Sequence, residues 1–206
     1  MIYDISQEVL SCNVYPGDPH PEIERVNSID RGDICNLTRL SMCAHNGTHV
    51  DAPFHFINDG KTLEKMPLDS FVGDCYVTHY EGEIDAGTTI SILDKAKKAD
   101  AGERILIGGK AVVTADAARE FAKAKIKLIG NESQTVGPEN APMEVHLILL
   151  GAGIVLLEGI RLAAVKEGRY FLSAAPLNLS GADGSPCRAF LITDERIYSS
   201  LQRCRW

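Results

Sequence analysis

Apolar and polar positions alternate along the segment that precedes residue 45. Between residues 35 and 45, one parity contains Leu40 and other apolar residues, whereas the opposite parity contains Arg39. Successive side chains of a strand point to opposite faces, so this alternation predicts a half-buried strand. The earlier segment 15–19 holds two prolines and a glycine, which favour a loop because they fix the backbone and cannot sustain a ladder.

The centre of the chain has a different pattern. Arg104–Ile107 is a short apolar run, and Ile126–Ile129 is another that ends at Gly130. Between them, Thr114 precedes an amphipathic stretch, Ala115–Lys125. A threonine hydroxyl can accept a hydrogen bond from a free amide in the first turn, so Thr114 is the predicted N-cap of this helix. Together these segments predict a β-α-β unit.

A further helix and strand are predicted downstream. Pro142 suits the first turn of a helix that continues through Leu150, and Gly151 could end it in a left-handed conformation. The extended run Ile154–Leu157 then places Glu158 at the end of a strand.

Three more segments read as strands, at 74–79, 170–175 and 187–192, and residues 181–186 connect the last two. No repeat, low-complexity tract or linker divides the chain. We therefore expect one mixed α/β domain over residues 1–206, rich in strand at both ends.

Composition and charge restrict the classes of partner. The 206 residues are 45% hydrophobic and 24% charged, and 21 basic against 28 acidic residues give a formal charge of −7. Nucleic acid and anionic membrane surfaces both require concentrated positive charge, so neither is an expected partner. The six cysteines lack CxxC spacing, and no signal-like or membrane-length segment is evident. Reduced thiols and a cytoplasmic location are therefore expected.

The chemistry-bearing residues are concentrated in the segment His45-Asn-Gly-Thr-His49-Val-Asp51-Ala-Pro-Phe-His55. A glycine, two β-branched residues and a proline within it oppose a helix and favour an extended chain. Side chains two positions apart then share a face, which brings His49 and Asp51 together. His45 is within reach across the turn, and His55 follows on the same parity.

Two imidazoles and a carboxylate from so short a segment form a mixed donor set suited to Zn²⁺, Mn²⁺ or Fe²⁺, whereas Ca²⁺ and Mg²⁺ prefer oxygen ligands. The alternative is a tight loop in which these polar residues only bond one another, as a lone histidine usually does. His146 and Glu158 are further candidates, because each interrupts apolar surroundings and a buried, unpaired glutamate is costly. Taken alone, each could equally be an exposed residue.

Four segments carry longer patterns: 41–56 contains HNGTHVDAPFH, 15–18 reads YPGD, 146–154 reads HLILLGAGI and 181–189 reads GADGSPCRA. They resemble the HxGTHxDxPxH, aromatic-PGD, HxxLLGAGI and GADGSPxRA elements of the metal-dependent cyclase family, which includes bacterial kynurenine formamidases and isatin hydrolases. The resemblance extends over nearly the whole chain and implies a swivelling β/β/α-like fold.

The resemblance also implies a set of site residues. Formamidase-like members bind two metal ions through the first two motif histidines, the motif aspartate, and a distant histidine and glutamate twelve residues apart. The matching ligands in this sequence are His45, His49, Asp51, His146 and Glu158. The last motif histidine, His55, would be the acid/base residue. Tyr15 occupies the position at which formamidases that act on N-formylkynurenine typically carry a pocket tryptophan, so it is the candidate substrate-binding residue.

These assignments predict a metal-dependent hydrolase of a small amide. One or two Zn²⁺ or Mn²⁺ ions per chain would activate water, and His55 would pass a proton to the departing nitrogen. The substrate would be an N-formyl arylamine such as N-formylkynurenine, or a cyclic amide of the isatin type. The resemblance further implies a homo-oligomer.

Two other interpretations keep the metal but not the reaction. The protein could hold a small carboxylate through the ion without turnover. The ion could instead be structural, with every coordination position closed by protein atoms.

Overall fold

A computed structural model describes residues 1–193, so Cys204 and the end of the expected domain lie outside the described residues. The central element is a nine-stranded sheet. Its strands, from one edge to the other, are β1 (Ile2–Asp4), β13 (Phe190–Ile192), β11 (Gly168–Ser173), β5 (Val72–His79), β7 (Arg104–Gly108), β9 (Leu128–Asn131), β10 (Val155–Glu158), β4 (His49–Asp51) and β12 (Gly184–Pro186). The four central strands, β5 to β10 in this order, run parallel, and the outer strands pair antiparallel.

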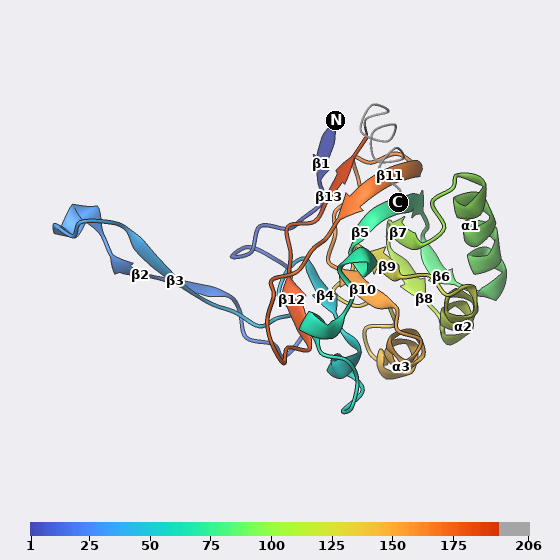
Figure 1. Cartoon of the computed structure of the whole chain (residues 1–206), viewed down its shortest axis with the longest axis horizontal. Coiled ribbons are helices and arrows are strands. Elements are labelled where there is room, and N and C mark those ends of the chain that lie inside the picture. The colour runs from blue at the N-terminus through green and yellow to red at the C-terminus, as the bar shows by residue number, and fades with distance from the viewer. Residues whose placement is uncertain (194–206) are drawn as a thin grey trace.

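Helices α1 (Ala86–Lys98), α2 (Ala115–Ala124) and α3 (Met143–Gly151) lie on one side of this sheet (Figure 1). A small parallel sheet of β6 (Gly82–Ile84) and β8 (Ala111–Val113) accompanies them. The predicted β-α-β unit is confirmed as β7, α2 and β9, with Thr114 as the cap that accepts a hydrogen bond from the Ala117 amide. The expected left-handed cap at Gly151 is wrong: Gly151 belongs to α3, and Gly153 has the positive φ, at 77°.

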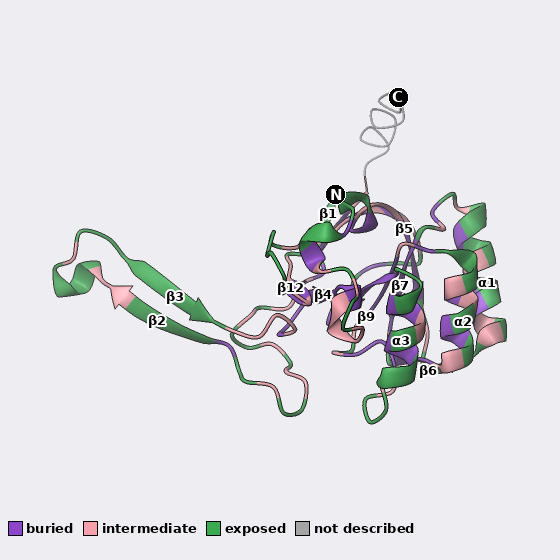
Figure 2. Cartoon of the chain, turned by 60° about the horizontal axis from the view of Figure 1, so that its bottom comes forward, coloured by how far each residue is buried: buried purple, intermediate pink, exposed green. Residues whose placement is uncertain are grey.

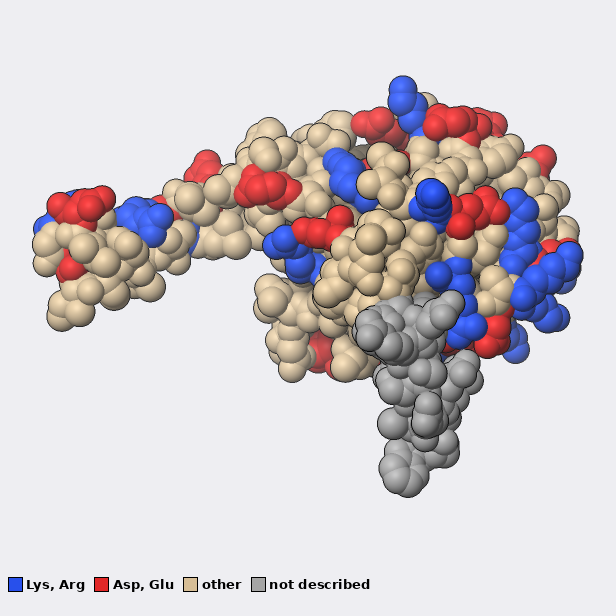
Figure 3. All heavy atoms as spheres, turned by 90° about the horizontal axis from the view of Figure 1, so that it is seen from above, with Lys and Arg blue, Asp and Glu red and all other residues tan. Residues whose placement is uncertain are grey.

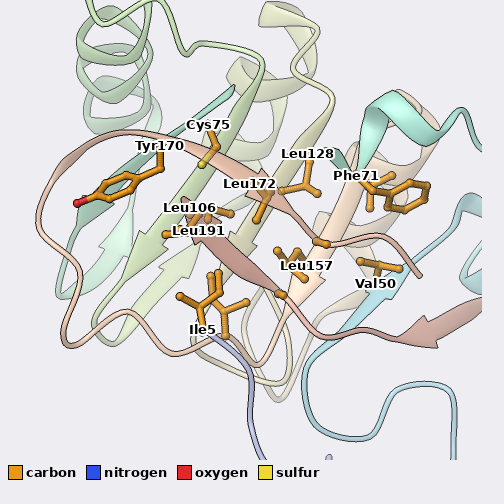
Figure 4. Packing of buried hydrophobic residues seen from close by; sticks show 14 of the residues in the cluster. Ile5, Val50, Phe71, Cys75, Leu106, Leu128, Leu157, Tyr170, Leu172 and Leu191 are labelled. Atoms are coloured by element: carbon orange, nitrogen blue, oxygen red, sulfur yellow. The ribbon is translucent and has the colours of Figure 1, made fainter. Parts of the chain in front are cut away.

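Both faces of the central strands are buried because each faces a separate hydrophobic cluster. Leu106 of β7 packs into the cluster enclosed by the curled sheet (Figure 4), whereas its neighbours Ile105 and Ile107 pack beneath the helices. β10 alternates in the same way, with Leu157 in the first cluster and Leu156 in the second. This explains why these strands read as continuous apolar runs in the sequence.

The prediction that the strand at 35–45 is half-buried is wrong. β3 (Leu37–Ser41) is a strand, but all five of its residues are exposed. It pairs only with β2 (Glu22–Asn27), and the two form an arm that extends away from the body of the protein (Figures 1 and 2). Alternation shows which side chains share a face, but burial also needs a covering layer, and within the described chain this arm has none.

The segment expected to connect the last two strands also differs. Residues 184–186 form β12, which pairs with β4, and the final strand begins at Phe190 rather than at residue 187. The five cysteines in residues 1–193 are all free. In the same range, no helix combines the length and the apolar character needed to cross a membrane. Basic and acidic side chains are interspersed over much of the face in Figure 3.

Candidate metal centre and active site

The sheet register brings the predicted ligands together. β4 lies between β10 and β12, with His49 opposite Glu158 and Asp51 opposite Gly184. His49 and Asp51 project to the helix face, because Val50 between them packs into the cluster on the opposite face. α3 covers the helix face and supplies His146, which is 2% exposed. Residues more than 100 positions apart therefore meet beside one short strand.

A tight turn places His45 next to this strand. Gly47 has a φ of 68°, in the left-handed region that favours glycine, and an added Cβ would lie 3.2 Å from the Cβ of Cys12. Asn46 is fully buried and accepts a hydrogen bond from the Cys43 amide. Gln134 donates to the Gly47 carbonyl at 3.0 Å. Contacts on several sides therefore fix the turn, as expected for a segment that sets the direction of the His45 side chain.

Each of the three histidines predicted as ligands is bonded through one ring nitrogen to an acceptor outside the centre. The pairs are His49 Nδ1 with the Gly47 carbonyl at 3.0 Å, His146 Nδ1 with the Pro142 carbonyl at 2.9 Å, and His45 Nε2 with Asp183 Oδ2 at 2.8 Å. Carbonyl and carboxylate oxygens only accept, so the bonded nitrogen carries the hydrogen in each ring. The other nitrogen of each neutral ring then presents its lone pair to the centre, as a metal ligand must.

The inner nitrogens surround two carboxylates. His45 Nδ1 is 2.8 Å from Asp51 Oδ1. His49 Nε2 is 3.4 Å from Asp51 Oδ1 and 3.4 Å from Glu158 Oε2. His146 Nε2 is 3.4 Å from Glu158 Oε1 and 3.8 Å from Asp51 Oδ2. The structure therefore brings together all five residues that the sequence predicts as ligands.

These residues fit a divalent cation. Asp51 is fully buried and Glu158 is 2% exposed. Asp51 Oδ2 has no hydrogen-bond partner, which is a costly state for a buried carboxylate oxygen unless a cation compensates it. Two groups of residues each offer donor atoms that lie within 4.8 Å of one another. One group is His49, Asp51 and Glu158, and the other is His45, Asp51 and His55. Asp51 belongs to both groups, so it is the natural residue to serve two ions.

The protonation of the centre reflects the carboxylates that contact its histidines. Burial disfavours the charged form of His45, but hydrogen bonds to Asp183 and Asp51 outweigh burial and raise its pKa to about 10. The pKa of His146 is also raised, because Glu158 outweighs burial. Burial favours the neutral acid of Asp51, but the neighbouring histidines, His45 first, lower its pKa. A metal ion must displace protons from these rings, so metal binding at the centre releases protons.

His55 lies next to the five predicted ligands, and one of its ring nitrogens belongs to the donor group with His45 and Asp51. It ends a short 3₁₀ turn, Pro53–His55, directly after β4. Its ring stacks on His45 with centroids 3.9 Å apart, and its Nδ1 is 3.3 Å from Asp183 Oδ2. A histidine next to a metal centre, with its Nε2 not engaged by this carboxylate, is placed for proton transfer.

Asp183 is the site residue that sequence reasoning missed. The GADGSPCRA segment contributed to the family resemblance, but no role was assigned to its aspartate. An available signal was Gly184 directly after it, because a glycine lets the main chain approach a neighbouring side chain closely. Indeed, a Cβ at Gly184 would lie 2.6 Å from Cε1 of His45.

A pocket of about 430 Å³ opens onto these groups. Its walls combine the centre with aromatic and polar side chains: Tyr15, Asp18, His45, His49, His55, Phe56, Gln134, Thr135, Pro142, His146, Glu158 and Asp183. Tyr15 lies in this wall as the candidate substrate-binding residue, and its hydroxyl donates to the Glu139 carbonyl at 2.7 Å. A small molecule could therefore reach the ligands and His55 from one side.

The mixed α/β fold and a histidine–carboxylate centre open to a pocket define a metal-dependent hydrolase. The model of the Cyclase family, described as "Putative cyclase", matches residues 3–138. The chain belongs to this family, and both the resemblance noted in the sequence and the expected fold are confirmed.

Known relatives support this assignment over almost the full length of the chain. It is 34% identical to a kynurenine formamidase from Erythrobacter litoralis (strain HTCC2594), covering 92% of this chain and 93% of the relative. It is 32% identical to a kynurenine formamidase from Salinibacter ruber (strain DSM 13855 / M31), covering 92% and 96%. A solved potential metal-dependent hydrolase with cyclase activity superposes with a TM-score of 0.78 at 29% identity, covering 93% of this chain and 96% of that one. Isatin hydrolase A from Labrenzia aggregata has a TM-score of 0.78 at 21% identity, covers 94% of each chain and shows the shared fold.

Proposed function

We propose that this protein is an arylformamidase-like hydrolase that cleaves the amide of an N-formyl arylamine, such as N-formylkynurenine, with Zn²⁺ or Mn²⁺ as its metal. The observation that carries the proposal is the convergence of five predicted donor residues next to His55, in a centre that opens to one pocket. The two formamidase relatives support the choice of substrate class. The five free cysteines support a cytoplasmic location, where thiols stay reduced.

The residues divide the reaction between them. His45, His49, Asp51, His146 and Glu158 would hold the metal. When bound, a divalent ion supplies a Lewis acid for the carbonyl and lowers the pKa of water from about 15.7 towards about 7. His55 has its lone pair on Nε2, so it can accept a proton from the attacking water and deliver one to the departing amine. Phe56, the next residue after His55, supplies an apolar wall for an aryl group.

The direct test is metal analysis of the purified protein followed by a substrate panel. We expect about one or two Zn²⁺ or Mn²⁺ per chain. Among formanilide, N-formylkynurenine, isatin and simple lactams, the two formyl arylamides should be hydrolysed, and a chelator should abolish this activity. Full activity in metal-free protein would contradict the proposal.

A cyclic amide of the isatin type is the second candidate substrate. The residues that line the pocket include no lysine or arginine, so none of them offers a permanent cation for the carboxylate of an amino-acid substrate. A neutral cyclic amide needs no such partner. Hydrolysis of isatin without hydrolysis of formanilide in the same panel would favour this candidate.

We also propose that the protein is a homo-oligomer in which the β2–β3 arm contacts another copy. An isolated two-stranded ribbon is only marginally stable in water. The arm nevertheless exposes several large apolar side chains, including Ile34 at 100%, Leu40 at 52% and its cross-strand partner Ile23 at 50%.

Sedimentation is expected to show a dimer or a larger assembly. Leu40→Lys places a charge on the arm and should shift the protein towards monomer. Ile90→Lys is the matched control, because Ile90 is 48% exposed on α1, away from the arm, and it should leave the assembly unchanged. A monomeric wild-type protein at micromolar concentration would remove this proposal.

A further inference from the structure

Asp183 touches two histidines with different tasks. Its Oδ2 atom is 2.8 Å from Nε2 of His45 and 3.3 Å from Nδ1 of His55. The two rings are stacked 3.9 Å apart at an interplanar angle of 27°, so their edges face the same carboxylate. One side chain therefore contacts both a metal ligand and the acid/base residue.

The chemistry of a carboxylate determines what this contact does. An aspartate side chain is ordinarily ionised at neutral pH, so the carboxylate of Asp183 only accepts hydrogen bonds. Both rings must therefore donate to it. In its neutral form, His45 then has its lone pair on Nδ1, on the side of Asp51, and His55 has its lone pair on Nε2. The opposite tautomers would place a lone pair against the anion.

The main chain holds Asp183 independently of the two rings. Its carbonyl accepts from the Ala52 amide at 2.8 Å, directly after β4. The adjacent carbonyl of Ala182 accepts from the Leu63 amide at 2.9 Å. On the other side, β12 begins at Gly184 and pairs with Asp51. The main chain at Asp183 is thus anchored to the strand that carries His49 and Asp51, so the fold places this residue beside both rings.

We propose that Asp183 is a positioning residue that fixes the tautomer and orientation of both His45 and His55, and so links metal affinity to proton transfer. The part that concerns turnover rests on the proposed hydrolase function, whereas the part that concerns the metal does not. Outer partners of this kind typically change metal affinity or activity by about 10–100-fold.

Asp183→Asn is the test variant because it keeps the shape of the side chain but removes the charge and one acceptor oxygen. We expect the affinity for Zn²⁺, measured by competition with a chromophoric chelator, to fall about 10–100-fold. At saturating Zn²⁺, kcat for formanilide should also fall while KM changes little, because Asp183 orients the rings rather than the substrate.

Glu64→Ala is the matched control for the position of the loop. Glu64 Oε2 accepts from the Gly181 amide at 3.0 Å, so it holds the same loop without touching either ring. This variant should keep the wild-type Zn²⁺ affinity and kcat. If it reproduced the losses of Asp183→Asn, loop placement rather than the carboxylate would explain them, and the proposal would be overturned.

A double variant separates the two histidines. In the His55→Ala background, Asp183→Asn should still weaken Zn²⁺ binding through His45, but it should no longer lower kcat. An undiminished kcat effect in that background would refute the link to His55, and an unchanged Zn²⁺ affinity in Asp183→Asn would refute the link to His45. If the wild type hydrolyses nothing in the panel, the proposed function fails, but the Zn²⁺ measurement still decides the role of Asp183 towards His45.

Discussion

His49→Ala is expected to remove both the metal and the activity. His49 is 1% exposed, and its Nε2 lies between Asp51 and Glu158, at 3.4 Å from each. Alanine leaves these two buried carboxylates without their central imidazole, so the site loses a ligand rather than an outer partner. We therefore expect hydrolysis to fall by more than the roughly 100-fold that loss of an outer partner can cost.

Thermal unfolding with and without Zn²⁺ provides a second measurement of the same variant. A ligand that binds only the folded state at 100 times its Kd stabilises it by about 2.7 kcal/mol. Zn²⁺ should therefore raise the Tm of the wild type and leave that of His49→Ala unchanged. His20→Ala serves as the control, because His20 is exposed and does not line the pocket. Normal Zn²⁺ stabilisation of His49→Ala would show that the ion binds elsewhere.

His55→Ala should separate metal binding from turnover. Only one of its ring nitrogens contacts Asp183, and the five proposed ligands remain in place without it. General acid–base groups contribute about 10²–10⁴-fold to rate, so kcat should fall by that factor while the metal content stays at the wild-type level.

Comparison of this variant with the wild type decides between the proposed enzyme and a non-catalytic binder of small carboxylates. A binder has no turnover for His55 to support, so the wild type itself would be inactive on the panel. If His55→Ala lost its metal as completely as His49→Ala, then His55 would be a ligand, and its assignment as the acid/base residue would be wrong.

Local patterns in the sequence predicted much of the fold correctly. The β7–α2–β9 unit was predictable because its signals are local: an apolar run, a capping threonine at the helix start, and a second apolar run. The metal centre was predictable for a similar reason, since three of its residues lie within seven positions. His146 and Glu158 needed the family resemblance, because their approach to β4 depends on long-range strand pairing.

The failures arose where a residue's environment depends on distant chain. The burial of β3 could not be inferred from its alternation, because whether another layer covers a strand depends on the rest of the fold. β12 was missed because three residues around Ser185 become a strand only through pairing with β4. Asp183 was missed for the same reason, since its two histidine partners are at least 128 positions away.

The position of β4 between β10 and β12 has a consequence for how relatives can diverge. Main-chain ladders hold the strand donors His49, Asp51 and Glu158, whereas Tyr15 and much of the remaining pocket wall come from loops and from the start of α3. Loops can change in length and side chain without disturbing the ladders. New substrate preferences can therefore evolve by exchanging the wall while the hydrolytic centre is inherited unchanged, which is consistent with formamidases and isatin hydrolases sharing one scaffold.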